Sequence, residues 1–260
     1  MLGIIGGTGL TRLATLAVAH REVVRTPYGE PSAALVFGQL AGVDAVFLAR
    51  HGHGHTIPPH RVNYRANLWA LKNRGARAIL AVASVGGIRG CAPGDLVLPH
   101  QLIDYTSGRP VTLFDGAEGG VVHIDFTRPY TPALRVHCLA AAEGAGVPVV
   151  DGGVYGAVSG PRLETAAEID RMDRDGATLV GMTGMPEAAL ARELGLPYAV
   201  ICVVVNHAAG RGDSAQTISM SGMAKVLETA MEQVHTLLSH AAPRIGPGDG
   251  DDRKEASDDS

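Results

Sequence analysis

The chain has 260 residues, of which 46 % are hydrophobic and 18 % are charged. This length favours one large α/β domain, and the composition excludes an intrinsically disordered chain. The formal net charge is -4. The sequence therefore lacks the basic surplus that is typical of nucleic-acid-binding domains, and we expect no nucleic-acid partner.

The negative charge is concentrated at the C-terminal end. Residues 246–260 hold six acidic and two basic side chains, which gives 2 − 6 = −4, whereas residues 1–245 hold 20 of each and balance. A segment rich in Gly, Asp and Ser buries little apolar surface. We therefore predict a folded domain over residues 1–245, followed by an acidic, disordered tail over residues 246–260.

The cysteines and the N-terminus indicate where such a chain resides. Cys91, Cys138 and Cys202 are odd in number and widely spaced, so we predict core thiols in a reducing cytoplasm and no disulfide framework. The N-terminus lacks the basic and apolar segments of a signal peptide. No apolar run reaches the roughly 18 residues that span a bilayer, so we expect a cytoplasmic protein with no membrane partner.

Short apolar runs alternate with amphipathic segments along the chain. The runs predict strands, in chain order, at Leu2–Ile5, Ala34–Phe37, Ala45–Leu48, Ala78–Val82, Asp95–Leu98, Val149–Val150, Val154–Val158, Thr178–Val180 and Ala199–Val205. The amphipathic segments predict helices at Tyr64–Arg74, Thr131–Glu143, Glu164–Arg174, Pro186–Leu194 and Ser221–Ser239. This alternation predicts an α/β fold, a single domain with a central mixed, largely parallel sheet flanked by helices. Ligands of such folds bind where strands end.

The first strand runs directly into Gly6-Gly7-Thr8-Gly9. Glycines at this place let backbone N–H groups approach an anion, and the Thr8 hydroxyl adds a donor. The motif lacks the lysine of a Walker A loop, and Arg12 replaces the third glycine of a dinucleotide fingerprint. A tight strand-to-helix turn without a ligand is the alternative interpretation.

A histidine-rich segment follows the third predicted strand. It reads Arg50-His51-Gly52-His53-Gly54-His55, with His60 beyond it. Imidazoles can ligate zinc, but no acidic residue or cysteine lies nearby to complete or orient a ligand set. We prefer an anion site in which Arg50 supplies a planar fork and His51 a further donor. A solvated loop without function is the third interpretation.

Later strand ends carry three further polar candidates. Ala81–Gly87 reads as a strand that runs into a glycine turn, where Ser84 could complete an anion cradle. Glu164 either caps a helix or holds its carboxylate at a pocket edge. Asn206 follows a buried strand, where an amide needs partners for both its oxygen and its nitrogen, although a turn residue is the alternative.

Together these motifs resemble the purine nucleoside phosphorylase superfamily of trimeric type, in particular its methylthioadenosine phosphorylase branch. The resemblance runs from about Leu2 to about Leu237. It rests on a set of short motifs whose order and spacing are highly specific: residues 6–9, 50–51, 63–67 (Asn-Tyr-Arg-Ala-Asn), 93–95 (Pro-Gly-Asp), 160–162 (Gly-Pro-Arg), 181–183 (Gly-Met-Thr) and 185–187 (Met-Pro-Glu).

The resemblance implies reversible phosphorolysis of an N-glycosidic bond, in which phosphate attacks C1′ as the purine leaves. It implies a phosphate site made of Thr8, Arg50, His51, Ala83, Ser84 and Thr183. It implies a nucleoside site made of Met182, Asn206, His207, Ala208, Glu164 and His123, with Asn206 and His51 as catalytic residues. His123 resembles a histidine lent to the neighbouring subunit, so we expect a homotrimer. Inorganic phosphate is the co-substrate, and neither a metal nor another cofactor is expected.

Departures from the methylthioadenosine branch predict the base. That branch places aspartates where this chain has Asn206 and Ala208, and a serine where it has Glu164. An amide can donate to the O6 carbonyl of a 6-oxopurine and still meet N7, whereas an ionised carboxylate only accepts. The 6-oxopurine enzymes resemble this chain in having a glutamate followed by Thr165, and Glu164 can accept N1–H. These residues predict hypoxanthine or guanine as the base.

The segment after Asn206 predicts the 5′ substituent. The 6-oxopurine enzymes place a histidine there to meet a 5′-hydroxyl, but this chain has Ile218, Met220 and Met223. Such side chains favour a 5′-methylthio group, although they could simply pack the start of a helix. We therefore predict phosphorolysis of S-methyl-5′-thioinosine to hypoxanthine and 5-methylthioribose 1-phosphate. The alternatives are phosphorolysis of methylthioadenosine, inosine or guanosine, and a nucleoside-binding protein without turnover.

Overall fold

The structure, a computed structural model, describes residues 1–116 and 120–246, and it contains all nine predicted strands and all five predicted helices. The strands are β1 (Leu2–Gly6), β2 (Ala17–Glu22), β3 (Leu35–Leu40), β4 (Val43–Ala49), β5 (Ala78–Gly87), β6 (Leu96–Leu98), β7 (Gln101–Asp104), β8 (Val149–Asp151), β9 (Val154–Ala157), β10 (Leu179–Gly181) and β11 (Tyr198–His207). The helices are α1 (Tyr64–Asn73), α2 (Pro132–Ala145), α3 (Ala166–Asp175), α4 (Gly184–Glu193) and α5 (Met220–Ala241), with short 3-10 helices at Pro59–Arg61, Gly212–Ser214 and Ala242–Arg244.

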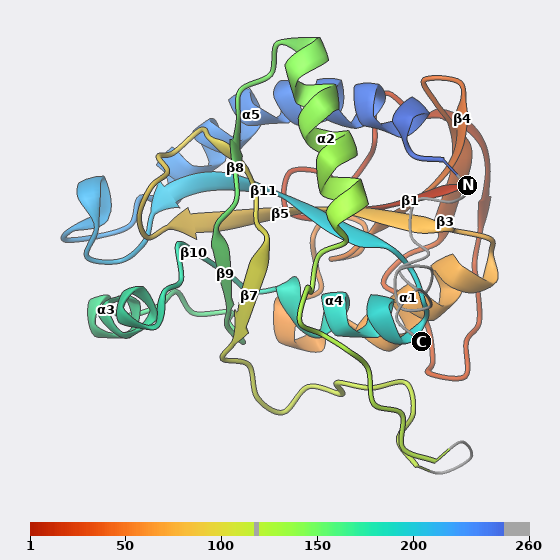
Figure 1. Ribbon diagram of the computed structural model, residues 1–260, viewed down its shortest axis with the longest axis horizontal. Helices are drawn as coiled ribbons and strands as arrows, with labels where there is room; N and C mark the ends of the chain where they lie inside the picture. The colour runs from red at the N-terminus through yellow and green to blue at the C-terminus, as the bar shows by residue number, and fades with distance from the viewer. Residues whose placement is uncertain (117–119, 247–260) are drawn as a thin grey trace, which may run out of the picture.

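All eleven strands belong to one mixed sheet. Its main path is β2-β3-β4-β1-β5-β10-β9-β7, and β11, β6 and β8 branch from β5. Six of the ten strand pairings are parallel, including the central neighbours β4, β1, β5 and β11. These four strands therefore end at the same edge of the sheet (Figure 1). The predicted fold class, a single α/β domain with a largely parallel sheet, is confirmed.

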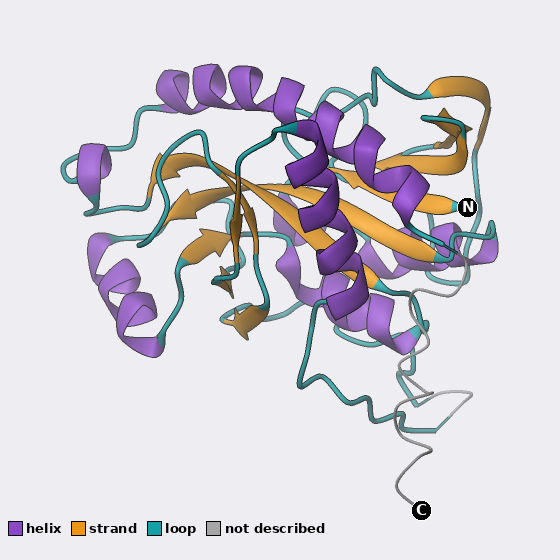
Figure 2. Ribbon diagram, turned by 45° about the horizontal axis from the view of Figure 1, so that its top comes forward, coloured by secondary structure: helices purple, strands orange, loops and turns teal. Residues whose placement is uncertain are grey.

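The sheet separates two hydrophobic layers. Along β11, Tyr198, Val200, Cys202 and Val204 belong to one buried cluster, and the residues between them belong to the other. The first cluster packs against α1 and α4 and the second against α2 and α5, so helices cover both faces (Figure 2). Because successive side chains of a strand point to opposite faces, a central strand between two layers must be apolar at every position.

The two strands that the sequence did not predict lie near or at edges of the sheet. Residues 17–22 of β2 read Ala-Val-Ala-His-Arg-Glu, and all but the last are exposed. Residues 101–104 of β7 are short and only partly buried. An edge strand pairs on one side and contacts little of the core, so it carries no apolar run for a sequence pattern to detect.

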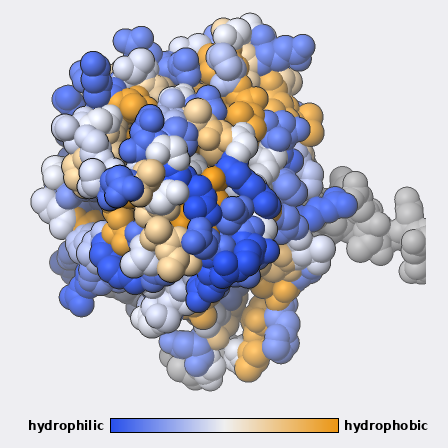
Figure 3. All heavy atoms as spheres, turned by 90° about the vertical axis from the view of Figure 1, so that its left-hand side faces the viewer, coloured by the Kyte–Doolittle hydropathy of each residue, from blue (hydrophilic) through white to orange (hydrophobic). Residues whose placement is uncertain are grey.

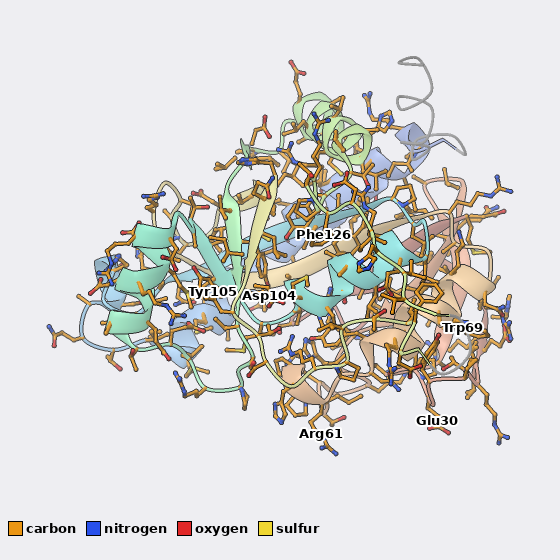
Figure 4. The ribbon with its side chains drawn as sticks, turned by 60° about the horizontal axis from the view of Figure 1, so that its bottom comes forward. Glu30, Arg61, Trp69, Asp104, Tyr105 and Phe126 are labelled. Atoms are coloured by element: carbon orange, nitrogen blue, oxygen red, sulfur yellow. The ribbon has the colours of Figure 1, made fainter. Side chains whose placement is uncertain are left out.

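A long segment joins β7 to α2, and its described residues form neither helix nor strand. Figure 1 shows this segment below the sheet, and Figure 4 labels Asp104 and Tyr105, where it leaves the sheet, and Phe126, where it returns. Phe126 is partly buried against the core, whereas Val111 and Val121 are more than half exposed. The segment thus extends away from the core before it returns to start α2.

Two further predictions concern the C-terminal end and the membrane. Ala242 is buried and Ile245 packs against the core. Residues 247–260 of the predicted tail lie outside the described residues. Among the residues that the structure describes, no helix combines the length and the apolar character needed to cross a membrane.

Candidate active site

A cavity of about 700 Å³ opens where the ends of five strands and their loops converge. Loops and strand ends from β1, β4, β5, β10 and β11 contribute to its wall. Ten of the predicted site residues line it: Thr8, Arg50, His51, Ala83, Ser84, Glu164, Met182, Thr183, Asn206 and Met220. Residues from distant parts of the chain thus share one cavity, as their positions after successive strands predict.

The loop after β1 approaches the wall of the cavity very closely. A Cβ atom added at Gly7 would lie 2.6 Å from the Val82 carbonyl oxygen and 2.8 Å from Arg50 Nη1. Both distances are shorter than a carbon atom allows, so glycine is required at this position. The same loop carries the exposed Thr8, and Ser84 Oγ lies 3.5 Å from the Thr8 carbonyl oxygen.

Arg50 is held by an ion pair that sequence reasoning did not assign. Its Nε and Nη2 atoms donate to the two carboxylate oxygens of Glu187 at 2.7 Å each, and Nη1 donates to the Val82 carbonyl at 2.9 Å. Tyr198 donates to the same carboxylate at 2.7 Å. Burial opposes the charge on Arg50, but the adjacent carboxylate outweighs it and raises the guanidinium pKa. Three of its five N–H groups are thus occupied, and two remain for a ligand.

His51 lies beside Arg50 and is only 5 % exposed. Its Nδ1 lies 2.8 Å from the carbonyl oxygen of Ile57. Burial, assisted by the positive charge of Arg50, lowers the imidazole pKa to about 4. The ring is therefore neutral at physiological pH. An anion site would instead suggest an imidazolium cation that donates hydrogen bonds.

Ala83, Ser84 and Thr183 complete this end of the cavity. The sequence predicted that Ala81–Gly87 runs into a turn, but this is wrong, since strand β5 continues to Gly87 because its last residues pair with β10 and β11. Thr183 is buried at the start of α4, and its side chain makes no capping hydrogen bond there. Thr8, Ser84 and Thr183, which carry hydroxyl groups, thus line the same cavity as Arg50.

Asn206 and Glu164 lie at another part of the cavity wall. The β5–β11 register shifts between Val204 and Asn206, and such a bulge redirects the side chains that follow it. Asn206 Nδ2 donates to the carbonyl of His207 at 2.6 Å, which orients the amide and leaves its oxygen and one N–H group available. Asn206 thus lies inside β11 rather than in a turn after it.

Glu164 does not cap a helix. Thr165 is the N-cap of α3, and together with Glu168 it forms a capping box. Glu164 precedes this box, lines the cavity and is partly buried. Burial, and then the nearby Glu168 charge, raises the pKa of the Glu164 carboxyl. A partly buried carboxyl group at the cavity wall that does not cap the helix is suited to bind a ligand.

The first turn of α5 supplies an apolar wall. Ser219 caps the helix by accepting from the N–H of Gly222 at 3.1 Å. Met220 and Met223 line the cavity, and Leu227 lies one turn further along. Met220 is 66 % exposed. A thioether that is not packed into the core is free to contact a ligand.

Five predicted site residues lie outside the cavity wall. Ala208 is 1 % exposed within an apolar cluster that packs against α3, and the ring of His207 accepts an N–H from Asp213 at 3.4 Å. Ile218 is partly buried without reaching the cavity, and Thr165 serves as the helix cap already described. His123 is exposed on the segment between β7 and α2.

Sequence reasoning missed a wall of the cavity that comes from residues 55–59. His55, Ile57 and Pro58 belong to it, and the His55 and His51 ring centroids lie 4.4 Å apart. Their position directly after the Arg50–His51 pair was the available signal. The described residues contain no group of three His, Cys, Asp or Glu side chains that could hold a metal ion.

Comparison with known proteins relates this site to one family. The profile of the Phosphorylase superfamily matches residues 1–242. The chain is 53% identical over 237 residues to a probable S-methyl-5'-thioinosine phosphorylase of Pseudomonas syringae pv. tomato, covering 91% of this chain and 96% of that protein. It is 41% identical over 250 residues to a 6-oxopurine nucleoside phosphorylase of Pyrococcus furiosus, covering 94% and 92%.

The solved structures agree with this relationship. Methylthioadenosine phosphorylase from Schistosoma mansoni, in complex with adenine, superimposes with a TM-score of 0.91. The two sequences are 33% identical, and the alignment covers 98% of this chain and 95% of the other.

Proposed function

This chain belongs to the phosphorylase superfamily, and from that premise we propose that it catalyses phosphorolysis of S-methyl-5′-thioinosine. The products are hypoxanthine and 5-methylthioribose 1-phosphate, so the enzyme is a pentosyltransferase of the purine nucleoside phosphorylase type. Its relatives of known or probable activity include phosphorylases of methylthioinosine and of 6-oxopurine nucleosides. Inorganic phosphate is the co-substrate, and no cofactor takes part.

One observation carries the choice of substrate. A single cavity joins a carboxylate and an amide, Glu164 and Asn206, to the thioethers of Met220 and Met223. The polar pair matches the edge of a 6-oxopurine, which presents N1–H, O6 and N7. The thioethers match a methylthio group, which needs no hydrogen-bond partner.

The reaction needs charge stabilisation at both ends of the breaking bond. Phosphate is held by the two free N–H groups of Arg50 and by hydroxyl groups such as Ser84 and Thr183. As the purine leaves, negative charge develops on the base. Asn206 donates its remaining N–H to O6, and its oxygen accepts N7–H once the departing base has taken a proton from solvent at N7, while Glu164 accepts N1–H. Positioning these donors before the reaction lowers the barrier.

Parallel assays of four nucleosides test this assignment. At matched concentrations with phosphate, we expect methylthioinosine to be cleaved faster than methylthioadenosine, inosine and guanosine. Faster cleavage of methylthioadenosine would contradict the roles of Glu164 and Asn206, and a preference for inosine would contradict the methylthio pocket. Release of base without phosphate would indicate a hydrolase, and binding without release would indicate a nucleoside-binding protein.

We further propose that the enzyme is a homotrimer in which His123 reaches the cavity of the neighbouring subunit. His123 is exposed and does not line the cavity of its own chain. The segment around it carries the exposed apolar residues Val111, Phe114, Val121 and Val122. Figure 3 shows apolar side chains gathered on the projection at the bottom of the molecule. Apolar side chains exposed in a group support burial against another subunit.

Subunit complementation tests the shared site. His123→Ala and Asn206→Ala are each expected to be inactive when expressed alone. Co-expression places an intact cavity beside a subunit that retains His123, so activity should return. Sedimentation should give three times the chain mass. Failure to restore activity, or a monomer in solution, would contradict the proposal.

We also place the enzyme in the cytoplasm. Cys138 and Cys202 are buried, Cys91 is partly buried, and all three are free thiols. Burial raises the pKa of the Cys91 thiol to about 11 and that of Cys138 to about 12, so neither thiol is reactive. Cell fractionation with detection of the native protein tests this location.

A further inference from the structure

We propose that His51 recognises the proton of the attacking phosphate. In this arrangement Nε2 accepts a hydrogen bond from the P–OH group, so the site selects a tetrahedral oxyanion that carries a proton. Monohydrogen phosphate and arsenate meet this requirement, and sulfate does not. The inference deepens the proposed function and rests on it, because that function makes phosphate the co-substrate.

The hydrogen bond of the other ring nitrogen determines which atom is protonated. Nδ1 of His51 lies 2.8 Å from the Ile57 carbonyl oxygen. A carbonyl oxygen only accepts, so Nδ1 carries the proton. A neutral imidazole has one N–H group, and Nε2 is therefore an acceptor. Nε2 makes no hydrogen bond to any residue in the described parts of the chain, although His51 lines the cavity.

The surroundings keep the ring neutral. Two titratable groups lie against His51, the guanidinium of Arg50 and the imidazole of His55. Burial opposes a positive charge on the His51 ring, and the fixed positive charge of Arg50 beside it opposes it further. Glu187 could neutralise an imidazolium, but its carboxylate already binds Arg50 and Tyr198. Within residues 1–116 and 120–246, the carboxylate nearest to this pair is therefore already engaged by other partners.

A buried acceptor distinguishes between anions of the same shape and charge. The lone pair on Nε2 repels an oxygen that carries no hydrogen, whereas it stabilises a hydroxyl group directed at it. Arg50, Ser84 and Thr183 line the same cavity and supply donors for the other phosphate oxygens in this arrangement. Sulfate could satisfy these donors, but it would leave Nε2 without a partner and against a negative oxygen, which costs binding free energy.

Direct binding to the wild-type protein without nucleoside is the first test. In calorimetry at slightly alkaline pH, phosphate and arsenate should bind with similar affinity. Sulfate should bind at least about tenfold more weakly, which corresponds to about 1.4 kcal/mol. Titrations in two buffers of different ionisation enthalpy should show that phosphate binding takes up no proton. Equal binding of sulfate, or uptake of a proton, would indicate an imidazolium and would overturn the inference.

A variant with a matched control assigns the effect to this ring. His51→Gln can turn an amide N–H towards the anion, so the phosphate-to-sulfate affinity ratio should fall by about tenfold. His53→Gln, which changes an exposed histidine of the same loop outside this cavity, should keep the wild-type ratio. An unchanged ratio in His51→Gln would contradict the proposal.

Nitrogen-15 NMR of the histidines is measured on the wild-type protein, so this test does not require that a variant folds. One ring should retain a protonated Nδ1 and an unprotonated Nε2 both before and after phosphate is added. A ring protonated at both nitrogens in the complex would overturn the inference. If phosphate binds selectively but no nucleoside is cleaved, the proposed function fails and this inference survives. If nucleosides are cleaved while sulfate binds as well as phosphate does, only the inference fails.

Discussion

Glu187 shows how a residue outside the reacting groups can organise an anion site. It is fully buried and binds both Nε and Nη2 of Arg50, so the guanidinium is fixed in one orientation before a ligand arrives. The fork that a bidentate ligand would normally use is occupied, and phosphate must use the remaining N–H groups. In the proposed function Glu187 is therefore a positioning residue, and Arg50, which lines the cavity, is the residue that contacts phosphate.

Removing Glu187 should destabilise the whole domain. Glu187→Ala leaves the charge of Arg50 buried and unpaired, which we expect to lower the free energy of unfolding by about 3–5 kcal/mol. Asp170→Ala, which breaks the exposed pair with Arg211, is the control and should cost at most about 1 kcal/mol. Urea denaturation measures both variants. Equal, small losses would show that the buried pair contributes little.

Glu164 should show a trade-off between stability and activity. The raised pKa of Glu164 means that the folded state disfavours the charged form of its carboxyl group. The protonated carboxyl group therefore stabilises the fold at acid pH, and this contribution is lost as the pH rises through the pKa of the folded state. At neutral pH, Glu164→Gln should therefore raise the free energy of unfolding. The same change should slow phosphorolysis of 6-oxopurine nucleosides by about ten- to a hundredfold, because a hydrogen bond to a charged group is lost.

The pH dependence of wild-type activity provides the control for Glu164. The carboxyl group must be ionised to accept N1–H, so kcat/KM should fall on the acid side at a pH above the pKa of an ordinary glutamate, about 4.3. Glu164→Gln should lose this acid limb. Asp170→Asn, on the exposed side of α3, removes the charge from a surface pair with Arg211, so it should cost at most about 1 kcal/mol of stability and leave the rate unchanged. A wild-type rate in Glu164→Gln would leave Glu164 without a role in base recognition.

At the scale of elements, the start of α3 gives different roles to Glu164 and Thr165, which are adjacent in one sequence motif. Thr165 and Glu168 satisfy each other's backbone N–H groups, and Arg162 pairs with Glu168. The helix therefore begins at Ala166, and Glu164 is left at the cavity wall. The capping box thus places Glu164 without using its carboxylate.

Thr165→Ala should affect stability and leave specificity unchanged. Loss of the N-cap hydrogen bond should lower the free energy of unfolding by about 1 kcal/mol. Because Thr165 does not line the cavity, the ratio of methylthioinosine to methylthioadenosine cleavage should keep its wild-type value. Thr165→Ser, which retains the cap, is the matched control. A changed substrate ratio in the alanine variant would restore Thr165 as a specificity residue.

The first turn of α5 should determine the 5′ preference. Met220→His replaces an apolar cavity residue with a group that can hydrogen-bond to a 5′-hydroxyl. We expect the inosine-to-methylthioinosine ratio of kcat/KM to rise by about tenfold or more, as one lost apolar contact allows. Lys225→Ala, on the exposed side of the same helix, should leave the ratio unchanged. No shift in Met220→His would mean that the methionines only cover the helix start.

At the scale of the whole molecule, the topology of the sheet determines where the site residues lie, and the net charge of the chain does not. The parallel strands β4, β1, β5 and β11 bring the Arg50, Ser84 and Asn206 regions to one edge. The net charge of -4 arises in residues 246–260, outside the match to the superfamily, which ends at residue 242. A neutral body can still bind an anion, because the field at a site depends on its own donors.

Deletion of residues 247–260 should therefore leave activity unchanged. The core contacts of Ala242 and Ile245 are retained in the shortened chain. We expect kcat/KM for methylthioinosine and the free energy of unfolding to stay within error of the full-length values. A second truncation before Ala242 removes a buried residue and should lower stability, which gives the comparison. A large loss of turnover in the first truncation would assign the tail a role in catalysis.

The sequence by itself determined the central strands, the helices and most cavity residues, because buried parallel strands are apolar at every position and polar residues after them stand out. It did not determine β2 and β7, which pair near or at edges and carry little apolar surface. Only the tertiary structure decided which groups meet. Arg50 and Glu187 are 137 positions apart, and a bulge places Asn206 in the cavity while Ala208 is buried in the core. The protonation of His51 likewise depends on the Ile57 carbonyl and the Arg50 charge, which no local pattern specifies.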